Sequence, residues 1–133
     1  MLPVKELVVD TSVWIEAFKG KTIPLLEESL KGGGVTLPPI VLAELLSGIR
    51  NKREEKNLTN FLSYIPLHPV GRSHWKKTGL LRAHLQSKGL SVSIPDCHIV
   101  QCCLDMEGIL LTYDKIFLKI ASLVKLNVVP FLV

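Results

Sequence analysis

Short apolar runs rich in β-branched residues alternate along the chain with longer segments whose apolar positions recur at helical spacing. This alternation predicts an α/β fold with a mostly parallel sheet, because parallel strands are joined by crossover helices. Strands are expected near residues 7–9, 35–37, 65–67, 109–112 and 127–129. Helices are expected over residues 11–18, 23–30, 38–49, 50–63, 73–87, 95–106 and 114–123.

Three consecutive glycines, Gly32 to Gly34, follow the second expected helix. A phosphate-binding P-loop would place a Lys-Ser/Thr pair at the start of a helix after its glycines. Here the next residues, Val35 to Pro38, are typical of a strand. The glycines are therefore interpreted as a turn that ends the preceding helix.

Length and composition indicate one globular domain that spans residues 1–133. Apolar residues make up 47% of the chain and charged residues 21%, a balance that excludes intrinsic disorder. The longest apolar runs fall far short of the roughly 18 residues of a membrane span, and no signal-peptide pattern is visible. We therefore expect the protein in the cytoplasm, with no membrane association.

Basic residues are concentrated in the middle of the chain. Residues 50–88 hold nine basic and two acidic residues, a net charge of +7, whereas the whole chain carries +4, which leaves −3 for the remainder. This asymmetry suits a polyanion bound by the middle of the chain, near an acidic centre formed by its ends. Solvated helix faces explain the same pattern, and charge alone favours that plainer interpretation.

Three cysteines, Cys97, Cys102 and Cys103, lie within one short stretch of the chain. An odd, clustered set provides no disulfide framework. A zinc site would need a second ligand pair elsewhere, and no such pair is recognisable by its spacing. The cysteines are therefore interpreted as small apolar residues of a buried helix. The four histidines show no ligand spacing either, although His98 either lines a site beside Asp96 or is a hydrogen-bonded helix residue.

Four acidic residues stand at or beside the expected junctions of strands and helices. Asp10 ends the first strand, Asp96 lies in the first turn of a proline-opened helix, and Asp114 follows the fourth strand. Each of these three has a capping or helix-dipole explanation of its own. Glu44 has none, because it is the only polar side chain in residues 37–46 and its helix is expected to be buried nearly all round. A buried, unpaired carboxylate is costly and needs a cation, a donor or a solvent-filled site.

The four acids are far apart in sequence, yet the predicted sheet brings them to one edge. Carboxylates held close together repel one another and raise each other's pKa, unless a hard divalent cation compensates their charge. Mg²⁺ or Mn²⁺ is the natural candidate, and one or two such ions activate water for phosphodiester hydrolysis. The basic middle segment would then hold a nucleic-acid backbone.

Several of these segments resemble motifs of the PIN-domain family of metal-dependent ribonucleases, and within it the VapC-like toxins of type II toxin–antitoxin systems. The resemblance covers most of the chain and rests on four pieces: Val8 to Ile15, Leu42 to Leu45, Pro95 to Ile99 and Leu111 to Asp114. The opening motif together with the ordered Asp, Glu, Asp, Asp set is fairly specific, whereas no single piece is.

The resemblance implies a three-layer α/β/α sandwich and an endoribonuclease that cleaves RNA with Mg²⁺ or Mn²⁺ and an activated water. Its metal-binding and catalytic pocket would be formed by four acids: Asp10, Glu44, Asp96 and Asp114. Ser12 and Thr112 would be hydroxyl neighbours that orient ligands or water. The resemblance further implies a homodimer and an antitoxin protein, which would insert a basic side chain near Glu44 and Asp96.

One position departs from the family pattern. Family members often continue the last motif as Thr-x-Asp-x-Asp-Phe, whereas this chain has Ile116 where the second Asp would stand. The departure keeps open a non-catalytic RNA- or protein-binding module with the same fold. A phosphoacceptor receiver domain fits less well, because residues 65–69 contain no aspartate. Trp14 and Phe18 belong either to the core or to a groove that receives the antitoxin.

Overall fold

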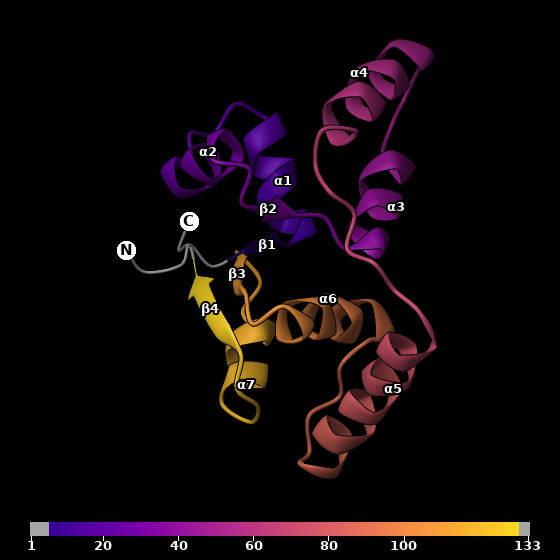
Figure 1. The fold of residues 1–133 in the computed structure, drawn as a ribbon, viewed down its shortest axis with the longest axis vertical. Helices are drawn as coiled ribbons and strands as arrows, with labels where there is room; N and C mark the ends of the chain where they lie inside the picture. The colour runs from indigo at the N-terminus through magenta and orange to yellow at the C-terminus, as the bar shows by residue number, and fades with distance from the viewer. Residues whose placement is uncertain (1–5, 131–133) are drawn as a thin grey trace.

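The computed structural model describes residues 6–130, which form four strands and seven helices (Figure 1). The strands are β1 (Leu7–Val9), β2 (Val35–Thr36), β3 (Ile109–Thr112) and β4 (Asn127–Pro130). The helices are α1 (Thr11–Phe18), α2 (Pro24–Lys31), α3 (Pro39–Ser47), α4 (Lys52–Leu62), α5 (Arg72–Ser87), α6 (Ile94–Asp105) and α7 (Ile116–Ala121). No helix in the described range is long and apolar enough to cross a bilayer.

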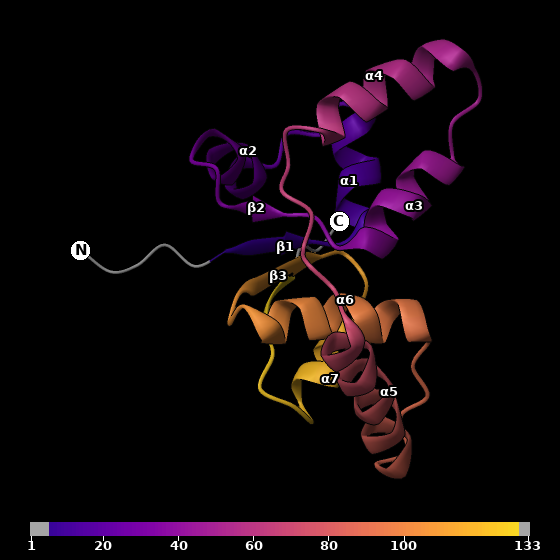
Figure 2. The same ribbon diagram turned by 45° about the vertical axis from the view of Figure 1, so that its right-hand side comes forward.

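The strands form one parallel sheet in the order β2-β1-β3-β4. Leu7 of β1 pairs with Val35 of β2 on one side and with Ile109 of β3 on the other. Helices α1 to α4 cover one face of the sheet and α5 to α7 cover the other, which confirms the predicted three-layer α/β/α sandwich (Figure 2). Because the strands are parallel, their carboxyl ends meet at one edge, where ligands bind in open α/β sheets.

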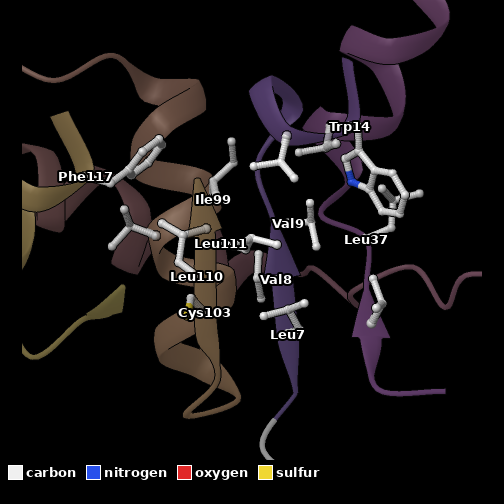
Figure 3. Packing of buried hydrophobic residues seen from close by; sticks show 14 of the residues in the cluster. Leu7, Val8, Val9, Trp14, Leu37, Ile99, Cys103, Leu110, Leu111 and Phe117 are labelled. Atoms are coloured by element: carbon white, nitrogen blue, oxygen red, sulfur yellow. The ribbon is translucent and has the colours of Figure 1, made fainter. Parts of the chain in front are cut away.

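The two central strands form the middle of the core. Their side chains are almost all apolar because helices cover both faces of the sheet. Val8, Val9, Leu110 and Leu111 are completely buried (Figure 3). Each such side chain contributes roughly 1.5 to 3 kcal/mol through burial, so these strands hold the carboxyl edge of the sheet in place.

The strand expected near residues 65–67 is reduced to a single parallel bridge between Leu37 and Leu67. The N–H of Leu37 donates to the carbonyl of Pro66, and the N–H of His68 donates to the carbonyl of Leu37, each at 2.8 Å. Pro66 has no N–H to donate, which limits the ladder at this edge of the sheet. The prediction of a fifth full strand is therefore wrong.

The third helix is shorter and less buried than the sequence predicts. α3 ends at Ser47, and Val41 and Leu45 are buried whereas Glu44 is exposed. The expectation of a helix buried nearly all round is wrong, because part of its surface lines an open groove instead of a neighbouring element. An apolar sequence alone does not show which helix faces find a packing partner.

The glycine run after α2 forms the predicted turn. Gly33 has a φ of 72°, a conformation that glycine adopts without strain. The N–H of Gly34 donates to the carbonyl of Ser29 at 2.9 Å, which closes the end of the helix. The run therefore leads the chain into β2 and does not bind phosphate as a P-loop does.

Gly108 leads into β3 at a point with no room for a side chain. An added Cβ would lie 2.7 Å from the carbonyl oxygen of Glu6 and 3.2 Å from Cγ of Met106. We expect Gly108→Ala to lower the free energy of unfolding by about 1 to 3 kcal/mol, because the backbone must shift. Urea unfolding measures the change. Gly79→Ala in α5 is the control, since an added Cβ there meets nothing within 4 Å; equal losses in both variants would contradict the prediction.

Candidate functional site

Asp10 follows β1 at the carboxyl edge of the sheet, and only 6% of its surface is exposed. It is the N-cap residue of α1, yet its side chain makes no capping hydrogen bond. Its Oδ2 instead accepts hydrogen bonds from Ser12 Oγ at 2.7 Å and from Thr112 Oγ1 at 3.0 Å. The capping explanation therefore does not account for this buried carboxylate.

The hydroxyls of Ser12 and Thr112 connect Asp10 to the loop after β3. Ser12 Oγ accepts a hydrogen bond from the N–H of Tyr113 at 3.2 Å, and Thr112 Oγ1 accepts one from the N–H of Asp114 at 2.9 Å. Each hydroxyl thus donates to a carboxylate and accepts from the backbone, which fixes its orientation. Both residues that were predicted beside the pocket lie in contact with Asp10.

Glu44 approaches the same edge from α3. Its Oε1 accepts a hydrogen bond at 3.0 Å from the hydroxyl of Thr11, the residue after Asp10. Its side chain is exposed, so the argument that a buried carboxylate needs a cation or a donor does not apply to Glu44. Thr11 is not among the residues predicted from the sequence. The feature of the sequence that could have identified Thr11 as a site residue is its position between Asp10 and Ser12, at the start of the first helix.

Asp96 lies in the first turn of α6, where Ser93 caps the helix and its Oγ accepts from the N–H of Asp96 at 3.2 Å. Burial raises the pKa of Asp96 above its ordinary value, and the negative charges of three other acids raise it further: Asp10, Asp114 and Glu44. Coulomb interactions weaken with distance. The shift therefore means that the structure brings the four predicted acids into one electrostatic neighbourhood.

Asp114 is exposed in the turn between β3 and α7. The sequence predicts that it starts the last helix, but α7 begins two positions later, at Ile116. Oδ1 of Asp114 accepts a hydrogen bond from the N–H of Ile116 at 3.1 Å, which stabilises the turn. The Ile116 side chain packs against the hydrophobic core. Ile116 thus makes an apolar contact at the position where the family pattern has a second carboxylate.

Within residues 6–130, the four acids form no ion pair with a basic side chain. In the described part of the chain, none of the ion pairs within 4.0 Å includes any of these carboxylates. Carboxylate and hydroxyl oxygens around uncompensated negative charge fit a hard divalent cation such as Mg²⁺, which prefers oxygen ligands and keeps several waters. The residues of the site therefore fit the ion that the sequence suggests.

A groove of about 1000 Å³ adjoins Glu44, one of the four acids. It lies among α1, α2, α3 and α4, and much of its lining is apolar, including Ile15, Phe18, Leu30, Leu45, Leu58 and Phe61. Glu44 lies on its wall, so the groove is continuous with the acidic neighbourhood. Lys21, also in the lining, places its Nζ 4.6 Å from the ring centroid of Tyr113. The groove therefore combines an apolar surface with charged side chains.

The structure distinguishes the two aromatic residues of α1. Trp14 is 1% exposed and belongs to the hydrophobic core, although it also lines the groove. Phe18 is 47% exposed and stacks on Trp14 with 5.8 Å between ring centroids. Phe61 of α4 meets both rings edge-on. Trp14 is thus a core residue, whereas Phe18 presents an apolar ring to the groove.

Comparison with protein families matches residues 7–123 to the PIN domain. Comparison with curated proteins finds no match. The structure is similar to DNA-bound VapBC from Salmonella typhimurium, with a TM-score of 0.80 and 21% identity over 96% of this chain and 98% of that chain. It is also similar to VapBC2 from Rickettsia felis bound to a promoter DNA fragment, with a TM-score of 0.76 and 20% identity over 94% and 98% of the two chains.

A third similar structure is VapBC-5 from Mycobacterium tuberculosis, with a TM-score of 0.69 and 21% identity over 97% of this chain and 100% of that chain. At these identities the likeness establishes the fold. The family match goes further, because it runs from β1 to beyond α7 and includes all four acidic residues of the site. The chain therefore belongs to the PIN-domain family.

Proposed function

We propose that this protein is an endoribonuclease that cleaves RNA phosphodiester bonds with Mg²⁺ or Mn²⁺, and that it is the toxin of a toxin–antitoxin pair. The observation that carries the proposal is that four acids from separate segments are neighbours: burial raises the pKa of Asp96, and the charges of the other three acids raise it further. Such a concentration of negative charge without basic partners destabilises the fold unless a divalent cation offsets it. A site that only stabilises the fold would be expected to pair its carboxylates.

The proposed roles follow from the contacts of each residue. Four acids would hold the ion: Asp10, Glu44, Asp96 and Asp114. The ion would supply positive charge to the scissile phosphate and lower the pKa of the attacking water. Ser12 and Thr112 orient Asp10 through their hydroxyls, and Thr11 does the same for Glu44. These three are positioning residues, because they act on the phosphate only through the carboxylates.

The basic helices α4 and α5 are proposed to hold the RNA backbone. Both views place them at opposite ends of the long axis, with α3 and α6 between them (Figures 1 and 2). Their exposed cations are Lys52, Arg53 and Lys56 on α4 and Arg72, Lys76 and Lys77 on α5. An RNA strand that contacts both helices would cross the region of Glu44 and Asp96, where cleavage is proposed.

Incubation of total cellular RNA with the purified protein, free of any antitoxin, tests the nuclease proposal. We expect discrete fragments that require Mg²⁺ or Mn²⁺ and that are absent when a chelator is present. Sequencing of the fragment ends would identify the target. A folded protein that binds RNA but cleaves none with either ion would instead favour the non-catalytic binding module that Ile116 keeps open.

An antitoxin is proposed to insert an apolar segment into the groove among α1 to α4. The similar solved structures are VapBC toxin–antitoxin complexes, which supports a partner of this kind. The exposed ring of Phe18 and the other apolar side chains offer a surface for such a segment. Glu44 adds a negative charge to the lining of the groove and is a charged neighbour of Asp96. A basic side chain of the antitoxin would therefore reach the acidic site.

We expect Glu44→Ala to weaken antitoxin binding about tenfold, because it removes one charge-assisted contact worth roughly 1.4 kcal/mol. Isothermal titration with the cognate antitoxin measures the change. Glu55→Ala is the matched control, since Glu55 is exposed on α4 and does not line the groove. Undiminished affinity of Glu44→Ala would remove the proposed contact with the basic side chain.

A homodimer is proposed on the family resemblance alone. Sedimentation equilibrium of the purified chain tests it directly. A monomer at all concentrations would contradict this part of the proposal without affecting the nuclease site, because the four acids come from one chain.

A further inference from the structure

Three buried side chains outside the acidic site converge where α5 meets α6. One donor atom from each of His68, His74 and Cys102 lies within 4.8 Å of the other two. His68 follows the bridge at Leu67, His74 lies in the first turn of α5, and Cys102 lies in the second half of α6. None of the three is more than 7% exposed. The fold thus gathers two imidazoles and a thiol away from solvent.

A carboxylate joins both histidines. Oδ2 of Asp105 lies 2.7 Å from Nδ1 of His74 and 3.3 Å from Nε2 of His68. Its Oδ1 accepts a hydrogen bond from Nε2 of Gln101 at 2.7 Å, which holds the carboxylate in place. Aspartate is itself a zinc ligand, and histidine ligands of metals commonly contact a carboxylate. Asp105 is therefore placed to orient both imidazoles beside a bound ion.

His98 orients His74 from the other side. Nε2 of His98 accepts a hydrogen bond from the N–H of Ile40 at 3.5 Å, so its Nδ1 carries the proton and donates to Nε2 of His74 at 2.7 Å. Trp75 stacks on the His98 ring with 4.7 Å between centroids. Of the two interpretations of His98 from the sequence, the structure thus supports the second, in which it is a hydrogen-bonded helix residue. Metal binding at His74 would exchange one of its two hydrogen bonds for a coordinate bond.

Cys102 differs from the two neighbouring cysteines. Cys97 and Cys103 belong to the hydrophobic core cluster, and Figure 3 shows Cys103 among the core side chains. Cys102 is buried but is not part of that cluster. Its Sγ lies 3.8 Å from Nε2 of His98, among polar groups. The prediction that the cysteines are buried is confirmed, but one of them faces potential metal ligands.

We propose that a zinc ion binds a second site, separate from the acidic residues and formed by His68, His74 and Cys102, with Asp105 as the carboxylate partner of both histidines. Two imidazole nitrogens and a sulfur match the ligand chemistry of Zn²⁺, whereas Mg²⁺ prefers oxygen alone. Donor atoms around tetrahedral zinc stand about 3.5 Å apart, so donors that already lie within 4.8 Å of one another reach the ion through small shifts of their side chains. The thiol proton of Cys102 leaves to solvent as the Zn–S bond forms.

The role of this ion is structural. It ties the segment after α4 to the first turn of α5 and to α6, and burial of all three ligands keeps a substrate away from the ion. The basic helix α5 packs chiefly on α6 within the described residues, so a shared ion fixes the direction of α5 relative to the sheet. The site stands independently of the proposed ribonuclease activity.

Cobalt titration of the full chain, after treatment with a chelator, tests the zinc site. Co²⁺ replaces Zn²⁺ in tetrahedral sites, and a cobalt–thiolate bond produces a charge-transfer absorption band that oxygen ligands do not produce. We expect a single equivalent of Co²⁺ to produce this band and a single equivalent of Zn²⁺ to abolish it. Asp96→Asn should leave the band unchanged, which separates this site from the acidic one.

Cys102→Ala should lose the band, whereas Cys103→Ala, the matched control in the core, should keep it. Excess Zn²⁺ should raise the melting temperature of the wild type by roughly 5 to 10 °C and leave that of Cys102→Ala unchanged. If Cys102→Ala does not fold, His68→Asn is the second variant and should weaken cobalt binding more than roughly tenfold. Absence of the thiolate band in the wild type, its persistence in Cys102→Ala, or its equal loss in Cys103→Ala would overturn the proposal.

Discussion

Asp96→Asn is expected to lower metal-dependent RNA cleavage by more than roughly 100-fold while the protein stays folded. Asparagine keeps the size of the side chain, and the backbone N–H that donates to Ser93 Oγ at 3.2 Å remains. The substitution removes only the negative charge of Asp96, one of the four neighbouring acids. Cleavage of one defined RNA at saturating Mg²⁺ measures the loss. Glu55→Gln, on the exposed surface of α4, is the control and should cleave like the wild type.

The same variant is expected to gain stability when divalent cations are absent. Burial and the neighbouring acids raise the pKa of Asp96, so the folded chain binds that proton more tightly than the unfolded chain does. The contribution of Asp96 to the stability of the wild type therefore falls as pH rises from the unfolded pKa, about 4, through the folded pKa, and stays lower above it. Asparagine carries no such penalty. Asp96→Asn should thus melt above the wild type at about pH 7, and the difference should vanish near about pH 3.

Thermal melts in chelator and in Mg²⁺ separate this effect from general changes in packing. Mg²⁺ should raise the melting temperature of the wild type more than that of Asp96→Asn, because the wild type retains the full set of acids. A variant that melts below the wild type at neutral pH in chelator would contradict the charge argument. Loss of cleavage together with higher stability would show that the charge of Asp96 lowers the stability of the fold but is needed for cleavage.

The order of strands and helices is predictable because the apolar runs of β1 and β3 are central strands with both faces covered. The short edge segments are less predictable. Leu67 lies in an apolar run, yet Pro66 leaves it with a single bridge to Leu37. In α3 every residue except Glu44 and Ser47 is apolar, but how much of the helix is buried depends on which elements pack against it.

The candidate site shows the same limit. The positions of Asp10 and Asp96 follow from local signals, a strand end and a proline-opened helix. The sequence predicts Glu44 as a buried carboxylate that needs a partner. Its side chain is exposed instead, and it accepts a hydrogen bond from Thr11. The sequence gives no signal for the group of possible metal ligands formed by His68, His74 and Cys102. These residues come from separate segments and share no recognisable spacing. Contacts between elements are fixed by packing, which sequence periodicity does not describe.

Thr112→Val is expected to lower RNA cleavage by roughly 10- to 100-fold, although Thr112 does not bind the ion in the proposed mechanism. Its hydroxyl donates to Oδ2 of Asp10 at 3.0 Å and accepts from the N–H of Asp114 at 2.9 Å. Valine has nearly the same shape but makes neither bond, so two of the four acids lose part of their support. The free energy of unfolding should fall by about 1 to 2 kcal/mol.

Thr36→Val is the matched control for this substitution. Thr36 is also a buried strand threonine, and its hydroxyl donates to Oε2 of Glu6 at 3.0 Å, the same length as the bond from Thr112 to Asp10. Glu6 precedes β1, at the opposite end of the strand from Asp10. Thr36→Val should therefore lose about 1 kcal/mol of stability and retain full cleavage. Equal cleavage by the two variants would contradict the positioning role, whereas a loss confined to Thr112→Val separates the orientation of Asp10 from the stability that both threonines provide.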